Sequence, residues 1–196
     1  MSQRVVVTGG AGFIGAVLVE RLLAEGHHVA VLDNFWRGSM ANLRSVADHA
    51  HLTVVEGDVT LADDLERCRQ ALGEVDLVHH LAAINGTKWF DEAALDVIDV
   101  NINGTLVALR KAQDWGARFV LASSPEAFGE NEGMPLRNDD ISQFPSASQH
   151  SVFPTVRANI LTKSQCSTLF ETAWTLVLCA PSTHMVPPCS VMPMGR

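Results

Sequence analysis

The chain has 196 residues, of which 47% are hydrophobic, so it is long enough to bury a core and is not a disordered chain. Lys and Arg total 14 against 22 Asp and Glu, and the net charge of -8 disfavours binding to nucleic acid or to anionic membranes. A small molecule is therefore the expected partner.

The N-terminus and the cysteines indicate a cellular location. The first residues lead straight into an apolar strand-like run without a secretory signal pattern, and no apolar run reaches the ~20 residues that span a bilayer. No Cys-x-x-Cys pair and no clustering with histidine is found among Cys68, Cys166, Cys179 and Cys189. We therefore expect a soluble cytoplasmic protein with reduced thiols and no metal site.

Short β-branched runs alternate with helix-like stretches along the first part of the chain. The expected strands are residues 4–8, 28–32, 52–56, 77–81 and 118–122, and the expected helices are residues 14–24, 63–71 and 94–114. This alternation is typical of βαβ units with right-handed crossovers around a parallel sheet. The sequence predicts an α/β fold with a doubly wound parallel sheet of the Rossmann type.

The composition changes near residue 140. Residues 1–140 hold every glycine except Gly195, whereas residues 141–196 hold most of the eight prolines and only one acidic residue. A stretch rich in Ser, Pro and Gln at residues 142–149 is typical of a loop. We expect one domain over residues 1–140 and a divergent or truncated remainder over residues 141–196.

A glycine-rich motif follows the first expected strand and opens the first expected helix. Gly9 allows a tight turn, Gly12 lets the backbone approach a pyrophosphate, and Gly15 lets the helix pack closely on the strand. The start of the helix, at Phe13 and Ile14, offers N–H groups and a positive dipole end to phosphates. The motif predicts a dinucleotide site.

Carboxylates end the second and third expected strands. Asp33 lies about 20 residues after Gly12, where a carboxylate accepts hydrogen bonds from the adenosine ribose and disfavours a 2′-phosphate. This favours NAD over NADP, although Arg37 nearby could soften the preference. Asp58 follows the third strand and could meet the adenine edge.

Six short motifs follow one another in the first 140 residues. They are Thr8-Gly9-x-x-Gly12-x-x-Gly15, Asp33-Asn34-Phe35-x-Arg37-Gly38-Ser39, Gly57-Asp58-Val59, His80-Leu81-Ala82-Ala83, Asn101-x-x-Gly104-Thr105 and Ala122-Ser123-Ser124-x-x-x-Phe128-Gly129. With these motifs the chain resembles the NAD-dependent epimerase/dehydratase family of extended short-chain dehydrogenase/reductases, which modifies nucleotide sugars.

The resemblance implies a cofactor, a substrate class and site residues. NAD would oxidise the sugar transiently, and the sugar would be rearranged or dehydrated and usually reduced again. Asn101 would help hold the active-site helix, and Ser124 would hydrogen-bond the sugar oxygen as its proton leaves. The other cofactor-binding residues implied are Asn34, Val59, Leu81, Ala82 and Ala83.

The sequence departs from the family at the acid/base pair, a tyrosine four residues before a lysine. The chain contains no tyrosine. In one register Phe153 and Arg157 replace the pair, and in the other Asn159 replaces the tyrosine while Lys163 is kept. We favour the second register, in which the catalytic residues are Ser124, Asn159 and Lys163, although it requires an insertion before Asn159.

Residues 175–181 look like the next strand of the family, and most of the family's C-terminal substrate region is expected to be missing after them. Three hypotheses follow. The chain is a nucleotide-sugar epimerase/dehydratase with impaired catalysis, a pseudoenzyme that binds NAD(H), or a truncated or frame-altered inactive product. The resemblance also implies a possible homodimer through the helical region 94–114.

Overall fold

A computed structural model of the protein describes residues 2–122. Five parallel strands form one sheet in the order β3-β2-β1-β4-β5. The strands are β1 (Arg4–Thr8), β2 (His28–Asp33), β3 (Leu52–Glu56), β4 (Leu77–His80) and β5 (Arg118–Leu121). All five expected strands are confirmed, with ends shifted by at most one residue, as is the doubly wound α/β class.

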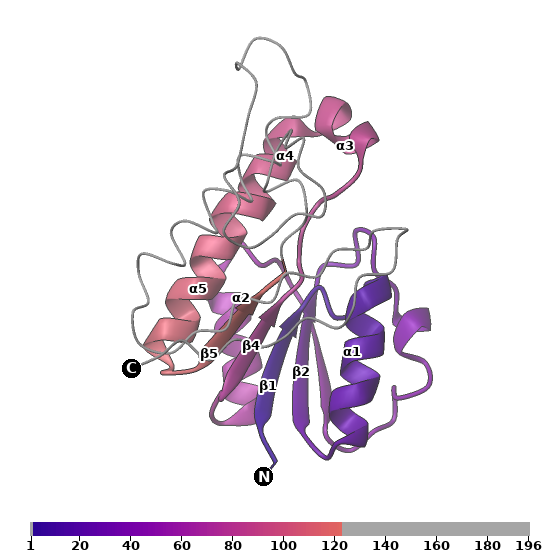
Figure 1. Cartoon of the computed structure of the whole chain (residues 1–196), viewed down its shortest axis with the longest axis vertical. Helices are drawn as coiled ribbons and strands as arrows, with labels where there is room; N and C mark the ends of the chain where they lie inside the picture. Colours follow the sequence, from indigo (N-terminus) through magenta and orange to yellow (C-terminus); the bar gives the residue numbers. More distant parts are fainter. Residues whose placement is uncertain (1, 123–196) are drawn as a thin grey trace, which may run out of the picture.

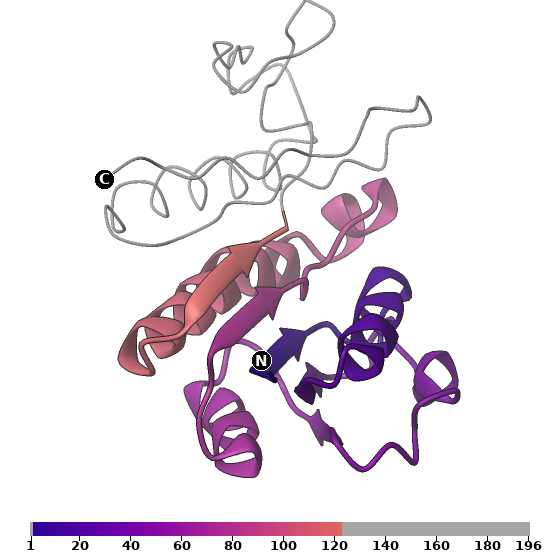
Figure 2. The same cartoon turned by 60° about the horizontal axis from the view of Figure 1, so that its bottom comes forward.

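Helices cover both faces of the sheet. They are α1 (Phe13–Ala24), η1 (Met40–Leu43), α2 (Ala62–Leu72), α3 (Thr87–Glu92), α4 (Ala94–Ile98), η2 (Asp99–Gly104) and α5 (Thr105–Asp114). Helix α1 packs on one face, whereas α2 and α5 pack on the other (Figure 1 and Figure 2). None of the helices within residues 2–122 has the length and hydrophobicity that crossing a bilayer requires.

Burial from both sides explains the nearly continuous apolar strands. Val5, Val6 and Val7 of β1 are fully buried, and their side chains alternate between the core under α1 and the core under α2 and α5. A parallel sheet covered on both faces selects such β-branched runs instead of polar alternation. This is why the strands could be recognised in the sequence.

The helix expected over residues 94–114 is one continuous helical stretch with a π-helical turn, η2, in its middle (Figure 1). The turn contains Asn101 and Gly104, both buried. A Cβ at Gly104 would lie 2.7 Å from Cγ1 of Val59, so only glycine lets the helix approach the loop after β3 this closely. Neither η2 nor the short helices η1 and α3 were predicted.

The carboxyl ends of the strands meet at one edge of the sheet (Figure 1). The crossovers lead from β1 to β2 in one direction along the sheet and from β3 across to β4 in the other, so the switch in direction lies between β1 and β4. In open α/β sheets, ligands bind outside the carboxyl ends at such a switch point.

Candidate cofactor site

The glycine-rich loop at the carboxyl end of β1 and the start of α1 have no room for a side chain at Gly9 or Gly15. Gly9 has φ +70°, and a Cβ there would lie 2.8 Å from the amide nitrogen of Ala82. A Cβ at Gly15 would collide with the carbonyl oxygen of Gly9. The loop thus packs backbone against backbone, and the first turn of α1 lies directly on it.

The start of α1 leaves amide groups for an anion. The first bond of the helix runs from the Ala16 N–H to the Gly12 carbonyl, so the amides of Phe13, Ile14 and Gly15 precede the helical ladder. No acidic residue lies in the first turn of α1. The side chains of Phe13 and Ile14 are 88% and 57% exposed and do not line the cleft, so these two residues can serve a phosphate only through their backbone.

Asp33 joins the glycine-rich loop to the loop after β2. Its Oδ2 accepts a hydrogen bond from the Ala11 amide and its Oδ1 accepts one from the Phe35 amide, both at 2.9 Å. The residue is 8% exposed and lines the cleft. Each carboxylate oxygen has a second lone pair, so Asp33 can still accept hydrogen bonds from a ligand hydroxyl.

A cleft of about 600 Å³, part of it open to solvent, lies over the switch point. Its lining includes these residues expected from the sequence: Gly9, Gly12, Asp33, Asn34, Val59, Leu81, Ala82 and Ala83. It also includes Leu32, Trp36, Arg37, Gly38, Gly57, Ile84 and Val100, none of which was predicted to bind the cofactor, although Arg37, Gly38 and Gly57 belong to the six motifs. Most of these residues lie within a few positions of the ends of β2, β3 or β4. A position near the carboxyl end of an expected strand was the signal that the sequence offered.

Asp58 turns toward its own loop and does not line the cleft. Its Oδ1 accepts hydrogen bonds from the amide and the hydroxyl of Thr60, and its Oδ2 accepts one from Nδ2 of Asn34 at 3.3 Å. Partial burial raises the pKa of Asp58, but the hydrogen bonds from Thr60 and Asn34 outweigh it and hold the pKa below its usual value. Asp58 thereby links the loops after β2 and β3.

Asn101 reaches the cleft wall through its amide group. Its Oδ1 accepts a hydrogen bond from the Ile84 amide at 2.8 Å, and its Nδ2 donates to the Ile84 carbonyl at 3.0 Å. Both groups are buried. The side chain thus fixes the backbone that lines the cleft after β4 and does not line the cleft itself.

A buried polar chain lies under the same wall. His80 bonds through Nδ1 to the Thr8 hydroxyl and through Nε2 to the Thr105 hydroxyl, each at 2.9 Å. The amides of Leu81 and Ala82 donate to the same Thr8 hydroxyl at 3.2 Å. Complete burial lowers the pKa of His80 to about 4, so the ring is neutral near pH 7.

Three predicted site residues, Ser124, Asn159 and Lys163, lie outside the described residues, as does the expected boundary at residue 140. Gly15 lies in the first turn of α1, packed on the glycine-rich loop, and does not line the cleft. Within residues 2–122, no group of three or more His, Cys, Asp or Glu side chains is arranged to hold a metal ion.

The sequence matches a family model described as the NAD dependent epimerase/dehydratase family over residues 5–167. UDP-glucuronic acid decarboxylase 4 of Arabidopsis thaliana is 36% identical over 141 residues, which are 72% of this chain and 29% of that protein. UDP-N-acetyl-alpha-D-glucosaminuronate decarboxylase of Bacillus cytotoxicus is 33% identical over 144 residues, 71% of this chain and 42% of that protein.

Solved structures give the same result. UDP-N-acetylglucosamine 4-epimerase from Methanobrevibacter ruminantium superposes with a TM-score of 0.76 at 27% identity, over 90% of this chain and 54% of that one. UDP-glucose 4-epimerase of Thermus thermophilus in complex with NAD superposes with a TM-score of 0.73 at 28% identity, over 88% and 53% of the two chains. The chain thus matches less than half of these curated relatives and about half of these solved structures.

Proposed function

The chain belongs to the NAD dependent epimerase/dehydratase family, and from this premise we propose that it binds NAD(H) in the cleft at the carboxyl edge of the sheet. NAD is the cofactor of that family, as the sequence predicted. The observation that carries the proposal is the position of Asp33, which is bonded to the glycine-rich loop and lines the cleft. A ribose whose hydroxyls donate to Asp33 would lie beside the phosphate-binding start of α1.

The residues of the cleft fit a dinucleotide. The amides that open α1 would bind the diphosphate, and Gly9 and Gly15, where a Cβ would collide with the backbone, allow the close packing that places these amides beside the cleft. Asp33 would bind the hydroxyls of the adenosine ribose, and its negative charge would repel a 2′-phosphate. Leu81, Ala82 and Ala83 would form the wall on the β4 side.

We further propose that the substrate class is a nucleotide sugar and that turnover is slow. The names of the relatives, which are UDP-sugar decarboxylases and epimerases, support the substrate class. The cleft residues would hold NAD, which would supply a hydride acceptor for the transient oxidation of the sugar. The chain has no tyrosine to exchange the accompanying proton, and an amide such as that of Asn159 cannot replace a phenol in this role.

The absence of tyrosine also favours a second candidate function, an NAD(H)-binding pseudoenzyme. It requires only the cleft of residues 2–122 and no proton transfer. The roles of Ser124, Asn159 and Lys163, a cytoplasmic location and a homodimer stay predictions, as does the third hypothesis of a truncated or frame-altered product.

Calorimetric titration with NAD+, NADH and NADP+ tests the proposal, using Asp33→Asn and, as the control, the exposed carboxylate variant Asp48→Asn. We expect the unaltered chain to bind NAD+ more tightly than NADP+. Asp33→Asn should weaken the affinity for NAD+ on the order of tenfold and reduce the difference in affinity between NAD+ and NADP+. Asp48→Asn should bind NAD+ as tightly as the unaltered chain does. A folded chain that binds no dinucleotide would contradict the proposal.

An assay with UDP-glucuronic acid and UDP-glucose separates the two candidates. Binding of NAD+ with slow but measurable conversion that Ser124→Ala abolishes supports the impaired enzyme. Binding without any conversion supports the pseudoenzyme. Conversion at the rates of ordinary enzymes, with kcat on the order of 10 per second, would contradict the proposed impairment.

A further inference from the structure

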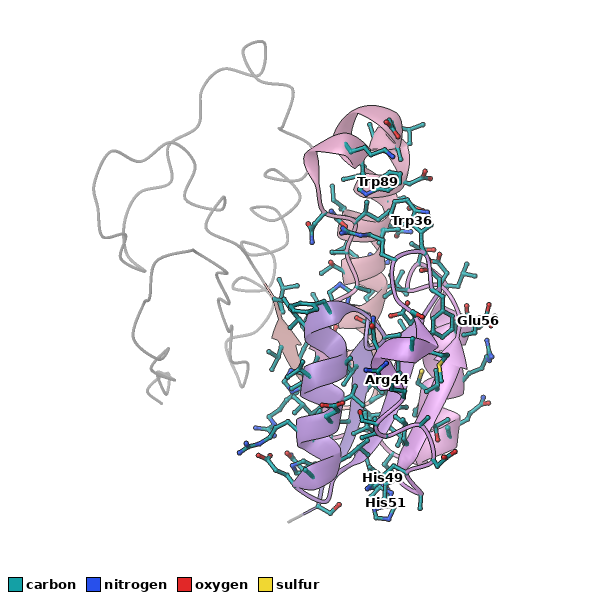
Figure 3. The ribbon with its side chains drawn as sticks, turned by 90° about the vertical axis from the view of Figure 1, so that its right-hand side faces the viewer. Trp36, Arg44, His49, His51, Glu56 and Trp89 are labelled. Carbon is teal, nitrogen blue, oxygen red and sulfur yellow. The ribbon has the colours of Figure 1, made fainter. Side chains whose placement is uncertain are left out.

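Two segments that flank the cofactor cleft touch each other across it. The first follows β2 and carries Trp36 and Arg37, and the second follows β4 and carries Asn85 and Trp89. The rings of Trp36 and Trp89 have their centroids 4.8 Å apart at an interplanar angle of 51° (Figure 3). Nη1 of Arg37 donates a hydrogen bond to the Asn85 carbonyl oxygen at 2.5 Å. We call these two interactions the cross-cleft contact.

The cross-cleft contact joins the two walls of the site already described. Trp36 and Arg37 line the cleft on the β2 side, and Ala83 and Ile84 line it on the β4 side, directly before Asn85. Gly9 lies between them at the end of β1. A dinucleotide that runs from Asp33 toward the β4 wall must therefore pass between the segments that the contact joins.

The first segment is fixed by local hydrogen bonds. The Phe35 amide donates to Oδ1 of Asp33, and the Trp36 amide donates to Oδ1 of Asn34 at 3.1 Å. Phe35 has φ +57°, a left-handed conformation that is uncommon for a residue other than glycine. These constraints aim Trp36 toward the opposite wall and leave it little freedom of its own.

The second segment is anchored at its base. Asn101 holds Ile84 with two hydrogen bonds. Two residues later Gly86 has φ +122°, and among the described residues only the Trp89 ring would lie within 4 Å of a Cβ at this position, at 3.5 Å. Lys88 places its Nζ 4.8 Å from the Trp89 ring centroid and is itself exposed. Gly86 is therefore the position where the segment can turn as a hinge between the anchored Ile84 and Trp89.

We propose that the cross-cleft contact is a gate on the cofactor cleft, which opens at Gly86 to admit NAD(H) and closes behind it. This inference rests on the proposed function, because it concerns entry to the same cleft. Trp36 is 44% exposed, so separating it from Trp89 uncovers little additional core. Opening is thus possible without unfolding the sheet, and the contact controls rates of exchange more than the affinity.

Stopped-flow binding of NADH to the whole chain tests the gate, with Trp36→Ala, Trp89→Ala and Arg37→Gln as variants. Trp115→Phe is the matched control, because Trp115 contacts Glu66 and Lys111 away from the cleft. We expect the association and dissociation rates of the tryptophan variants both to rise about two- to tenfold, with a smaller change in Kd. The gate would be contradicted if the association rate of the tryptophan variants were unchanged, or if their affinity fell only because the dissociation rate rose.

A second measurement does not require a cofactor. Two tryptophans in contact couple their transitions, so Trp36→Phe and Trp89→Phe should each remove the same band from the near-ultraviolet circular dichroism spectrum, and Trp115→Phe should leave it. If the band is absent, the contact does not exist and the gate is wrong. If the band is present but the unaltered chain binds no NADH, the proposed function fails and the gate fails with it. Normal binding with unaltered rates in the variants overturns the gate alone.

Discussion

The Thr8 hydroxyl on β1 donates a hydrogen bond to Nδ1 of His80 at the end of β4, and the rest of the buried chain determines this direction. Thr105 donates its hydroxyl proton to the Asn101 carbonyl at 2.8 Å, so it can only accept from Nε2–H of His80. The neutral ring then has an acceptor at Nδ1. The Thr8 oxygen remains free to accept from the amides of Leu81 and Ala82. His80 is therefore the tautomer protonated at Nε2, and its two hydrogen bonds connect α5 to the cleft wall.

Thr8→Val should destabilise the protein by about 1–3 kcal/mol, because it leaves the Ala82 amide and the buried Nδ1 of His80 without their shared partner. The Leu81 amide keeps its second acceptor, the Thr8 carbonyl oxygen. Thr8→Ser keeps the hydroxyl and should lose less than half as much. The free energy of unfolding from urea titrations measures both. Equal losses in the two variants would mean that the methyl group, not the hydrogen bonds, provides the stabilisation.

Stability should fall as the pH decreases from about 6.5 toward 4. Burial lowers the pKa of His80 to about 4, and burial together with the charge of Arg118 also lowers the pKa of His79. In this pH range the unfolded chain therefore binds more protons than the folded chain. The contribution of the neutral histidines to the free energy of unfolding is fully present above the pKa that histidine has in the unfolded chain. Urea unfolding at several pH values gives the slope, and NMR titration should show that His80 stays neutral between pH 5 and 8. A ring that titrates near 6.5 would contradict this expectation.

Gly9→Ala and Gly26→Ala form a matched pair, since both glycines have positive φ, at +70° and +82°. A Cβ at Gly9 would meet the Ala82 backbone, whereas a Cβ at Gly26 would have no atom of residues 2–122 within 4 Å. Gly26→Ala should lower the free energy of unfolding by about 1 kcal/mol, because alanine disfavours a positive φ. Gly9→Ala should lose more stability and should also abolish NAD+ binding in calorimetry. Normal binding by Gly9→Ala would show that the loop does not need this close approach.

Glu66→Gln should lower the free energy of unfolding by about 1 kcal/mol at neutral pH. Glu66 on α2 accepts hydrogen bonds from Lys111 at 2.9 Å, Arg69 at 2.5 Å and Trp115 at 3.3 Å, and chiefly the Lys111 bond lowers its pKa from 4.5 to about 2. The ionised carboxylate thus stabilises the packing of α2 on α5 above pH 4.5, and this contribution is lost as the pH falls toward 2.

The control for Glu66 is Glu92→Gln. Glu92 pairs with Lys88, and both side chains are more than half exposed, so the variant should have nearly unchanged stability. Measured by urea unfolding, the difference between the two variants should shrink when the pH is lowered to about 3. A difference that persists there would mean that the shape of the side chain at position 66 matters and its charge does not.

The strands, the glycine-rich loop and Asp33 could be predicted because their signals are local. A strand buried on both faces is a run of β-branched residues, and a glycine motif between such a run and a helix has one structural meaning. The expected single helix at 94–114 shows the limit of this reasoning. Its periodicity is helical throughout, but the π turn lies where Asn101 bonds to Ile84 and Gly104 contacts Val59, which no local pattern contains.

The sequence by itself determined the fold class, the cofactor and the family, because these depend on short patterns that each lie within a few residues. The tertiary structure decided which residues meet around the cleft and beneath its wall: Thr8 with His80, Asn101 with the Ile84 backbone, and Trp36 with Trp89. Each of these pairs joins elements far apart in the chain. Such contacts follow from strand order and helix packing, which place the ends of β1, β2 and β4 side by side, and not from the spacing of the residues in the sequence.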